Sequence, residues 1–226
     1  YSVMAKESGL LEVPDPYYGG DDGFDRVLSM IEDGSRGFLS SLKNEHEFLR
    51  DWLFVNYQQN FDVSNLNSFN LPVTAEYFCA IYSVDELASA NVFAKKNNLG
   101  VTVLGEGTNI ILPSFVVGLV IKVEIKGINI DDKKNQNQPL VTISAGENWH
   151  SCIEFLLKKD IYGLENLSLI PGSVGASVIQ NIGAYGVELS DVLSSVEVFD
   201  LNTNCVISLS AESCGLSYRD SIFKNE

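Results

Sequence analysis

The chain has 226 residues, 45% of them hydrophobic and 20% charged, a composition typical of a globular protein that buries its own core. Its 30 acidic and 15 basic residues give a formal net charge of −15. That charge argues against a nucleic-acid partner but allows a small anionic ligand held by backbone amides. No apolar run reaches the ~20 residues that span a bilayer, and no leader sequence begins the chain, so we expect a cytoplasmic protein without a membrane partner.

The four cysteines are scattered along the sequence and form no C-x-x-C pair. Free thiols in a reducing cytosol are the preferred interpretation, and two disulfides are the alternative. A chain of this length needs no structural metal to hold its core, and we expect no metal site.

Two zones precede Asn67. Residues 1–43 open with a turn-rich stretch, Pro-Asp-Pro-Tyr-Tyr-Gly-Gly at residues 14–20, and continue into a predicted helix with one apolar stripe. The stripe consists of Phe24, Val27, Leu28, Ile31, Phe38, Leu39 and Leu42. Residues 44–66 are rich in Asn, Gln and Asp and have poor periodicity, so we interpret them as a connector with one docking element.

From residue 67 to the end, predicted strands alternate with predicted helices. Strands are expected at residues 75–82, 101–104, 116–123, 140–145, 192–201 and 205–209, and helices at residues 83–97 and 149–159. The first of these helices opens with a capping box formed by Ser83 and Glu86. Such a mixture indicates an α+β or α/β domain.

A glycine-rich turn, Leu-Gly-Glu-Gly-Thr-Asn at residues 104–109, follows one of the predicted strands directly. Its two glycines let the backbone bend sharply and bring several amide N–H groups close to a phosphate. Thr108 and Asn109 add side-chain donors. The turn lacks the third glycine and the following helix of the dinucleotide fingerprint, and by itself it is more often an ordinary turn.

Two further stretches carry chemistry. Residues 170–186 contain four glycines and four other small residues, which favours a flat ligand packed against exposed backbone. A close-packed crossing of small residues is the alternative. The sequence Ser-Tyr-Arg-Asp-Ser at residues 217–221 places Arg219 either in a structural ion pair or as a fixed cation aimed at a carboxylate.

Taken in this order, these stretches resemble the UDP-N-acetylenolpyruvoylglucosamine reductase family. Ala-Gly-Glu-Asn-Trp-His at residues 145–150 and Gly-Leu-Glu-Asn-Leu at residues 163–167 belong to the same pattern. Asn-Ser-Phe at residues 67–69 is similar to the Asn-Thr-Phe that begins the family's FAD domain. The resemblance covers residues 67–226 and implies an α+β fold, the FAD-binding domain of the vanillyl-alcohol oxidase type with two α+β subdomains.

The family uses FAD and NADPH to reduce UDP-N-acetylglucosamine enolpyruvate to UDP-N-acetylmuramate, a peptidoglycan precursor, so the resemblance implies both cofactors and a nucleotide-sugar substrate. The residues that it places at FAD are Gly105, Glu106, Gly107, Thr108, Asn109, Pro171, Gly172, Gly175, Ala176, Gln180, Asn181, Ile182 and Gly183. Tyr185 and Tyr218 would lie on the substrate side. Arg219 matches the family's active-site arginine, which would hold the enolpyruvyl carboxylate and stabilise developing negative charge.

The sequence departs from the family in two respects. Ser173 and Val178 stand where the family commonly has Cys and Pro. The family's substrate-binding domain, its proton-donating serine and its catalytic glutamate would all lie beyond Glu226. We therefore expect little or no turnover from this chain alone.

The N-terminal zone, residues 1–43, resembles the last third of a low-molecular-weight protein tyrosine phosphatase, in which Asp15 would be the general acid. That chemistry also requires a C-x5-R phosphate loop, and the sequence contains none; Cys214 to Arg219 is C-x4-R. The leading interpretation is a reductase fragment joined to a phosphatase remnant. The alternatives are a tyrosine phosphatase and a non-catalytic FAD-binding module. The apolar stripe, without its own phosphatase core, predicts docking or self-association.

Overall fold

The computed structural model describes residues 55–131 and 139–224, which belong to one compact unit that begins at Val55. The phosphatase-like segment with Asp15, the apolar stripe and the first part of the predicted connector lie outside the described residues.

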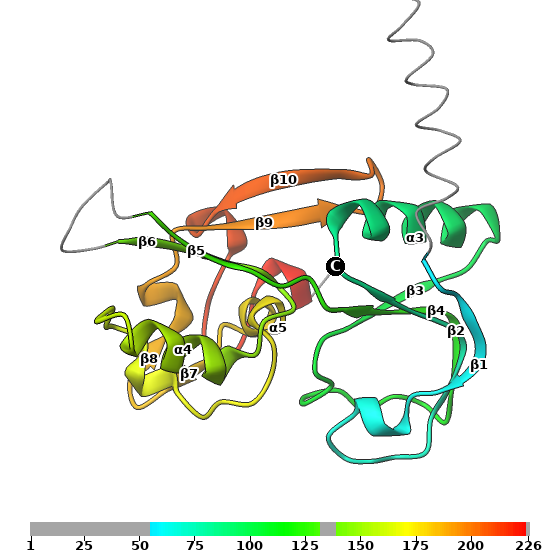
Figure 1. Ribbon diagram of the computed structural model, residues 1–226, viewed down its shortest axis with the longest axis horizontal. Coiled ribbons are helices and arrows are strands. Elements are labelled where there is room, and N and C mark those ends of the chain that lie inside the picture. Colours follow the sequence, from blue (N-terminus) through cyan, green and yellow to red (C-terminus); the bar gives the residue numbers. More distant parts are fainter. Residues whose placement is uncertain (1–54, 132–138, 225–226) are drawn as a thin grey trace, which may run out of the picture. The chain divides into compact units, whose positions relative to one another are not determined.

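The first half of this unit, residues 55–123, contains a four-stranded sheet with strand order β1-β2-β4-β3 and one long helix (Figure 1). Its elements are β1 (Gln58–Asp62), η2 (Ser64–Leu66), β2 (Thr74–Ile81), α3 (Val84–Lys96), β3 (Val101–Leu104) and β4 (Phe115–Val123). β1 is antiparallel to β2, whereas β2, β4 and β3 are parallel to one another. The C-terminal ends of the parallel strands therefore meet at one edge of the sheet, where residues 105–109 begin.

Helix α3 begins at the predicted N-cap Ser83, but only one of the two hydrogen bonds of the predicted capping box is present, because Glu86 accepts from the amide before Ser83. Ser83 Oγ accepts a hydrogen bond from the Glu86 amide at 3.1 Å, and Glu86 Oε2 accepts one from the Tyr82 amide at 2.6 Å. Asp85 and Glu86 lie in the first turn, and Lys95 and Lys96 in the last, so the charges complement the helix dipole at both ends. The prediction of a capped helix at this position is confirmed.

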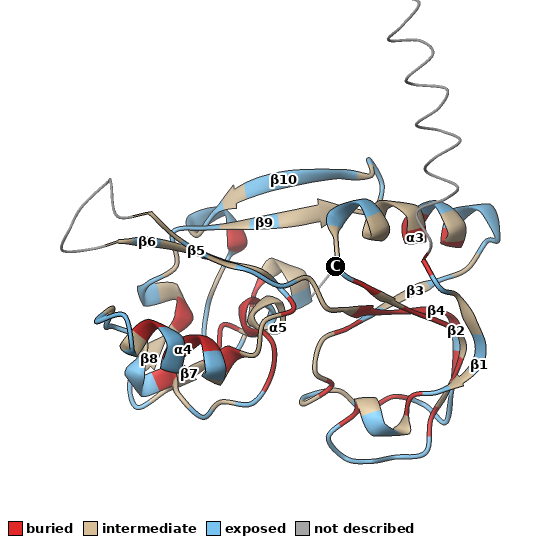
Figure 2. Cartoon of the chain, viewed as in Figure 1, coloured by how far each residue is buried: buried red, intermediate tan, exposed pale blue. Residues whose placement is uncertain are grey.

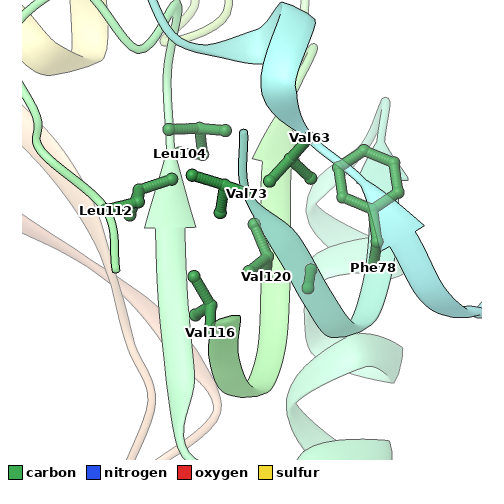
Figure 3. Packing of buried hydrophobic residues seen from close by; sticks show 8 residues of the cluster. Val63, Val73, Phe78, Leu104, Leu112, Val116 and Val120 are labelled. Carbon is green, nitrogen blue, oxygen red and sulfur yellow. The ribbon is translucent and has the colours of Figure 1, made fainter. Parts of the chain in front are cut away.

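Apolar side chains pack on both faces of the sheet. One cluster lies between the sheet and the loops that follow η2 and β3 (Figure 3): Val63, Val73, Ala75, Phe78, Leu104, Leu112, Val116 and Val120. The other cluster lies under α3: Val55, Cys79, Ile81, Ala90, Ala94, Leu119 and Ile121. β2 and β4 supply residues to both clusters, which explains their almost continuous apolar sequences (Figure 2).

The second half, residues 128–224, consists of hairpins and short helices around a separate core. Its elements are β5 (Ile128–Asp131), β6 (Leu140–Ile143), α4 (Trp149–Leu157), η3 (Glu165–Leu167), α5 (Val174–Ile179), β7 (Gly183–Ala184), β8 (Val187–Glu188), η4 (Leu189–Asp191), β9 (Ser195–Asp200), β10 (Cys205–Ser210), η5 (Glu212–Cys214) and η6 (Ile222–Lys224). Trp149 is central to this core, and its indole N–H donates to the carbonyl oxygen of Leu167 at 2.8 Å. The mixed strands and helices of both halves confirm the α+β class.

One boundary in the sequence interpretation differs from the structure. Residues 55–66 fall in the predicted connector, yet Val55 and Val63 are buried, and β1 pairs with β2 in register from Gln58↔Phe78 to Asp62↔Thr74. The segment escaped prediction because its sequence, Gln-Gln-Asn-Phe-Asp, has no alternation of apolar and polar residues. An edge strand can be held by its backbone hydrogen bonds, so its side chains need not carry that signal.

None of the helices in the described ranges has the length and apolar character that crossing a membrane requires. All four cysteines are free thiols, three of them buried and Cys205 exposed.

Candidate functional site

The turn after β3 has a shape that only glycine permits at its centre. Gly107 has φ +64°, and a Cβ built on it would lie 2.0 Å from the carbonyl oxygen of Leu66. The turn is anchored to the segment after η2, because the Ser68 amide donates to the carbonyl oxygen of Gly107 at 3.0 Å and Ser68 Oγ to that of Thr108 at 3.3 Å. Its conformation is therefore fixed from outside the turn.

The backbone amides of this turn are available to a ligand. Within the described ranges, no backbone or side-chain group accepts a hydrogen bond from the amides of residues 106–109. Buried or half-buried amides are normally paired, and successive unpaired amides in a glycine turn form a concave anion site. These residues fit the phosphate groups of a dinucleotide.

A second loop, residues 170–177, is held against the segment at residues 145–149. The Trp149 amide donates to the carbonyl oxygen of Gly172, and the Gly175 amide to that of Ala145, both at 2.9 Å. A Cβ on Gly175 would lie 2.8 Å from the Cβ of Ala145. Gly175 is thus small because it packs closely against Ala145, which is the alternative to a ligand-binding role that the sequence left open.

The two loops come from different halves and meet. Thr108 Oγ1 donates to the carbonyl oxygen of Pro171 at 3.3 Å, and Asn109 Nδ2 to Gln180 Oε1 at 2.9 Å. A Cβ on Gly105 would come within 2.5 Å of Ser173 Oγ, so the side chain of Ser173 packs directly against the glycine turn. The structure therefore brings together the glycine turn and the small-residue run, as the resemblance implies.

Asn148 completes this junction, although no pattern in the sequence marks it as a site residue. Its Nδ2 donates to Glu106 Oε1 at 2.8 Å, while its Oδ1 caps α4 by accepting from the Ser151 amide at 2.9 Å. The available signal was the N-cap position of Asn148 before a predicted helix. Capping alone gave no reason to expect a contact with residue 106.

In residues 180–186, which follow α5, some side chains are buried in the protein and others are exposed. Ile182 is 3% exposed and belongs to the second core, and Asn181 is completely buried. Nδ2 of Asn181 donates to Glu188 Oε2 at 2.8 Å and to the carbonyl oxygen of Ser217 at 3.1 Å, and its Oδ1 accepts from the Ser190 amide at 3.0 Å. The side chains of Asn181 and Ile182 are thus not directed to a ligand.

Arg219 lies in a tight turn beside this run. The amides and carbonyls of Ser217 and Asp220 exchange two hydrogen bonds of 3.1 Å, and Arg219 has a left-handed φ of +56°. Its Nη2 donates to the carbonyl oxygen of Gly183 at 3.1 Å. A guanidinium has five N–H donors, so this bond orients the group and leaves donors for a ligand. Tyr185 lies between β7 and β8 and is 89% exposed. Tyr218 lies in the same turn as Arg219 and is 81% exposed.

A charged cluster at the end of β4 was not predicted. Lys122, only 9% exposed, forms a salt bridge of 2.7 Å with Glu124, and Lys126 lies 3.6 Å from the same carboxylate. Burial alone would raise the pKa of Glu124, but the hydrogen bond and charge of Lys122, together with Lys126, lower it. Lys126 Nζ also donates to the carbonyl oxygen of Gly146, so the cluster supports the segment under the second loop. In the sequence, Lys122 is one lysine within an apolar strand, which does not predict a cluster of three charged residues.

Comparisons with known proteins agree with this architecture. The model of the FAD binding domain family matches residues 75–209, and that of low molecular weight phosphotyrosine protein phosphatase matches residues 2–48. The UDP-N-acetylenolpyruvoylglucosamine reductase of Buchnera aphidicola subsp. Schizaphis graminum is 40% identical over 162 residues, covering 72% of this chain and 46% of the relative. That of Bdellovibrio bacteriovorus is 42% identical over 172 residues, covering 75% and 50%. The chain thus spans about half the length of these relatives.

Solved structures show the same fold. The UDP-N-acetylenolpyruvylglucosamine reductase of Thermus caldophilus superposes with a TM-score of 0.57 at 23% identity, over 74% of this chain and 56% of that one. 6-Hydroxy-D-nicotine oxidase of Arthrobacter nicotinovorans gives 0.53 at 17% identity, over 70% and 36%. These neighbours share the vanillyl-alcohol oxidase type of FAD-binding fold. With more than half of its residues matched by the family model, the chain belongs to the FAD binding domain family.

Proposed function

We propose that this chain binds FAD, with the diphosphate held where the glycine turn at residues 105–109 meets the loop at residues 171–176. The observation that carries the proposal is the set of amides at residues 106–109 that have no acceptor among the described residues. Two loops from two halves suit the two phosphates of FAD better than the single phosphate of FMN. The hydrogen bond from Thr108 to the carbonyl oxygen of Pro171 holds the two loops next to each other.

The proposed FAD residues act in different ways. Glu106 contributes its amide, because a carboxylate cannot donate to a phosphate and its Oε1 already accepts from Asn148. Gln180 uses Oε1 to accept from Asn109, which leaves its NH2 group for the cofactor. Asn181 and Ile182 contribute backbone only, since their side chains are buried in the fold. Gly107 permits the positive φ of the turn.

We further propose that the whole protein is an NADPH-dependent reductase of UDP-N-acetylglucosamine enolpyruvate, as the names of its relatives suggest. Bound FAD would supply the hydride transfer. Arg219 would hold the enolpyruvyl carboxylate with the donors that Gly183 does not use and would stabilise negative charge as the double bond is reduced. The exposed rings of Tyr185 and Tyr218 would contact the nucleotide sugar.

Three other proposals concern the location of the protein, its domains and a second candidate function. The four free thiols fit a reducing cytoplasm. Residues 1–43 would form a phosphatase-like tail through which chains self-associate, residues 55–226 the FAD domain, and the substrate-binding domain would lie outside this chain. The match to the phosphatase model keeps tyrosine phosphatase as a second candidate, with Asp15 as its general acid.

Titration with FAD tests the main proposal. Purified chain should change the fluorescence of FAD on binding and should bind FMN much more weakly. Gly107→Ala, which forces a Cβ into the Leu66 carbonyl, should abolish binding, whereas Gly100→Ala, with no atom within 4 Å of the added Cβ, should not. A wild-type chain that leaves FAD fluorescence unchanged would contradict the proposal.

A phosphatase assay separates the second candidate. An intact C-x5-R loop is absent from the sequence, so we expect no hydrolysis of an aryl phosphate. Hydrolysis that Asp15→Ala abolishes would establish phosphatase activity. Addition of NADPH and the enolpyruvyl substrate to FAD-loaded protein then distinguishes a reductase from a non-catalytic FAD-binding module.

A further inference from the structure

Helix α3 reaches across to the turn of the β9–β10 hairpin, in the other half of the unit (Figure 1). Asn91, in the middle of α3, is only 2% exposed. Its Nδ2 donates to the carbonyl oxygen of Leu201 at 2.7 Å and to Asn204 Oδ1 at 2.9 Å. One turn later on the helix, Lys95 Nζ donates to the carbonyl oxygens of Leu201 and, at 3.1 Å, Asn202. We call this set of contacts the α3 clamp.

The β9–β10 turn that α3 contacts is also held by hydrogen bonds of its own. Asp200 Oδ1 accepts from the Asn202 amide at 2.8 Å, and Oδ2 accepts from Thr203 Oγ1 at 2.7 Å. These bonds from Thr203 and Asn202 lower the pKa of Asp200. The Asn204 amide donates to the carbonyl oxygen of Asp200 at 2.8 Å, with Asn204 itself at φ +59°. The carbonyls of Leu201 and Asn202 are therefore fixed in position before α3 contacts them.

The clamp joins the same two halves that supply the proposed FAD site. The glycine turn extends from the sheet that α3 covers, and the loop at residues 171–176 belongs to the half that contains the hairpin. The Thr108–Pro171 and Asn109–Gln180 contacts bridge the halves at the site, and the α3 clamp bridges them at the hairpin. The contacts at the site and the contacts at the hairpin therefore restrain the relative position of the halves at two separate places.

We propose that the α3 clamp holds the two halves at the spacing that FAD requires, and that Asn91 and Lys95 are positioning residues for cofactor binding. This inference rests on the proposed binding of FAD. Both amide donors of Asn91 are used on the hairpin, so loss of the side chain leaves Leu201 and Asn204 without that partner. Preorganised sites bind more tightly because less ordering accompanies binding. Loss of the clamp should therefore weaken FAD binding although no clamp residue is placed at the cofactor.

Lys95→Ala and Lys96→Ala form a matched pair that tests the clamp. Both residues are exposed lysines in the last turn of α3 and both changes remove one positive charge, but Lys95 donates to the hairpin turn. We expect the Kd for FAD to rise about five- to thirtyfold in Lys95→Ala, the equivalent of one or two hydrogen bonds, and to be unchanged in Lys96→Ala. Equal Kd values for the two variants would overturn the proposal.

Asn204 provides a second test that does not disturb the helix. Asn204→Asp keeps the oxygen that accepts from Asn91, whereas Asn204→Gly removes the acceptor and still tolerates the φ of +59° at this position. FAD affinity should be retained in the Asp variant and reduced in the Gly variant, at temperatures where both are fully folded. Equal affinities of the Asp and Gly variants would contradict a positioning role.

Hydrogen exchange of the FAD-free chain tests the α3 clamp independently of the proposed FAD binding. Asn91→Ala should raise amide exchange of peptides that cover both the β9–β10 turn and α3, while those covering β2 and β4 remain protected. Failure of the wild-type chain to bind FAD would overturn the proposed function. Unchanged exchange in Asn91→Ala would instead overturn the clamp, whether or not FAD binds.

Discussion

The side-chain amide of Asn181 donates to the carbonyl oxygen of Ser217 over 3.1 Å, which ties the end of α5 to the turn that carries Arg219. Asn181 is completely buried, and its other contacts reach Glu188 and Ser190. Ser221 adds a second tie, because its Oγ donates to the carbonyl oxygen of Ile179 at 2.6 Å. The position of the proposed catalytic arginine therefore depends on buried polar groups rather than on its own exposed turn.

From this relationship we predict that Asn181→Ala destabilises the chain by about 1–3 kcal/mol for each buried polar group left without a partner. Urea unfolding provides the measurement. Asn166→Ala removes the same side chain from an exposed position in η3 and should change the free energy of unfolding by less than about 0.5 kcal/mol. Similar losses in both variants would show that the Asn181 contacts contribute little.

A second prediction concerns three glycines with different local constraints. Gly100 has no atom within 4 Å of an added Cβ; Gly186 also has space but has φ +79°, and Gly107 has both φ +64° and a carbonyl oxygen 2.0 Å away. Alanine should be neutral or slightly stabilising at Gly100 and should cost about 1–2 kcal/mol at Gly186. At Gly107 it should be the most destabilising of the three. Thermal unfolding of the three variants measures this order, and a Gly107→Ala protein as stable as Gly100→Ala would contradict the described turn.

A third prediction follows from the strand inside the predicted connector. A chain that begins at Val55 should fold and keep its FAD affinity, because it retains β1 and the buried Val55 and Val63. A chain that begins at Val63 loses β1, exposes the edge of β2, and removes the stacked contact of Phe61 with Phe78. It should be much less soluble or unfolded. Circular dichroism and FAD titration distinguish the two, and equal stability would show that β1 is dispensable.

The same strand shows how far the sequence could be interpreted. Long elements with a strong periodic pattern, such as α3 and β4, were predicted within two residues of their observed bounds. β1 was missed because its strand is defined by pairing with β2 and not by its own residues. Motif order correctly indicated the FAD-binding fold, because glycine turns reflect backbone constraints that survive in sequence. The direction of a side chain could not be predicted from the motif. Asn181 was predicted to bind FAD, but its side chain is buried in the structure.

A fourth prediction uses the buried thiols. Burial, with the charge of Glu86, raises the pKa of Cys79 to about 12, and burial, with Glu147, raises that of Cys152 to about 11, from an ordinary value of 9.0. Between pH 9 and pH 11 the unfolded chain therefore loses protons that the folded chain keeps. Ionisation of these thiols favours the unfolded state, so their contribution to stability is constant below pH 9 and is lost as the pH rises above it.

The expected slope is about 1.4 kcal/mol per pH unit for each such thiol. Urea unfolding at several pH values measures it. Cys79→Ala should reduce the slope. Cys205 is exposed, whereas the other three cysteines are buried, so we expect Cys205 to react first with a thiol reagent. A slope that Cys79→Ala does not alter would contradict the assigned cause.

The last prediction concerns Arg219 in a full-length reductase that includes this domain. Its side chain is exposed and, among the described residues, donates one hydrogen bond, to the carbonyl oxygen of Gly183, so Arg219→Ala should change stability little and should retain FAD. Reduction of the bound flavin by NADPH does not require a partner for the substrate carboxylate and should be nearly normal. Reduction of the enolpyruvyl group should slow by about a hundredfold to a thousandfold, as for loss of one donor to a developing oxyanion.

Stopped-flow measurement of the two half-reactions separates these effects. Arg219→Lys keeps the charge but not the planar fork, so it should recover only part of the rate. Lys224→Ala is the matched control, because Lys224 is an exposed cation that contacts Arg219 only through its backbone carbonyl oxygen. A normal second half-reaction in Arg219→Ala would remove Arg219 from the catalytic residues. Loss of FAD in that variant would instead assign the hydrogen bond between Arg219 and Gly183 to the cofactor site. That bond joins the arginine to residues 180–183, which we propose lie along the flavin.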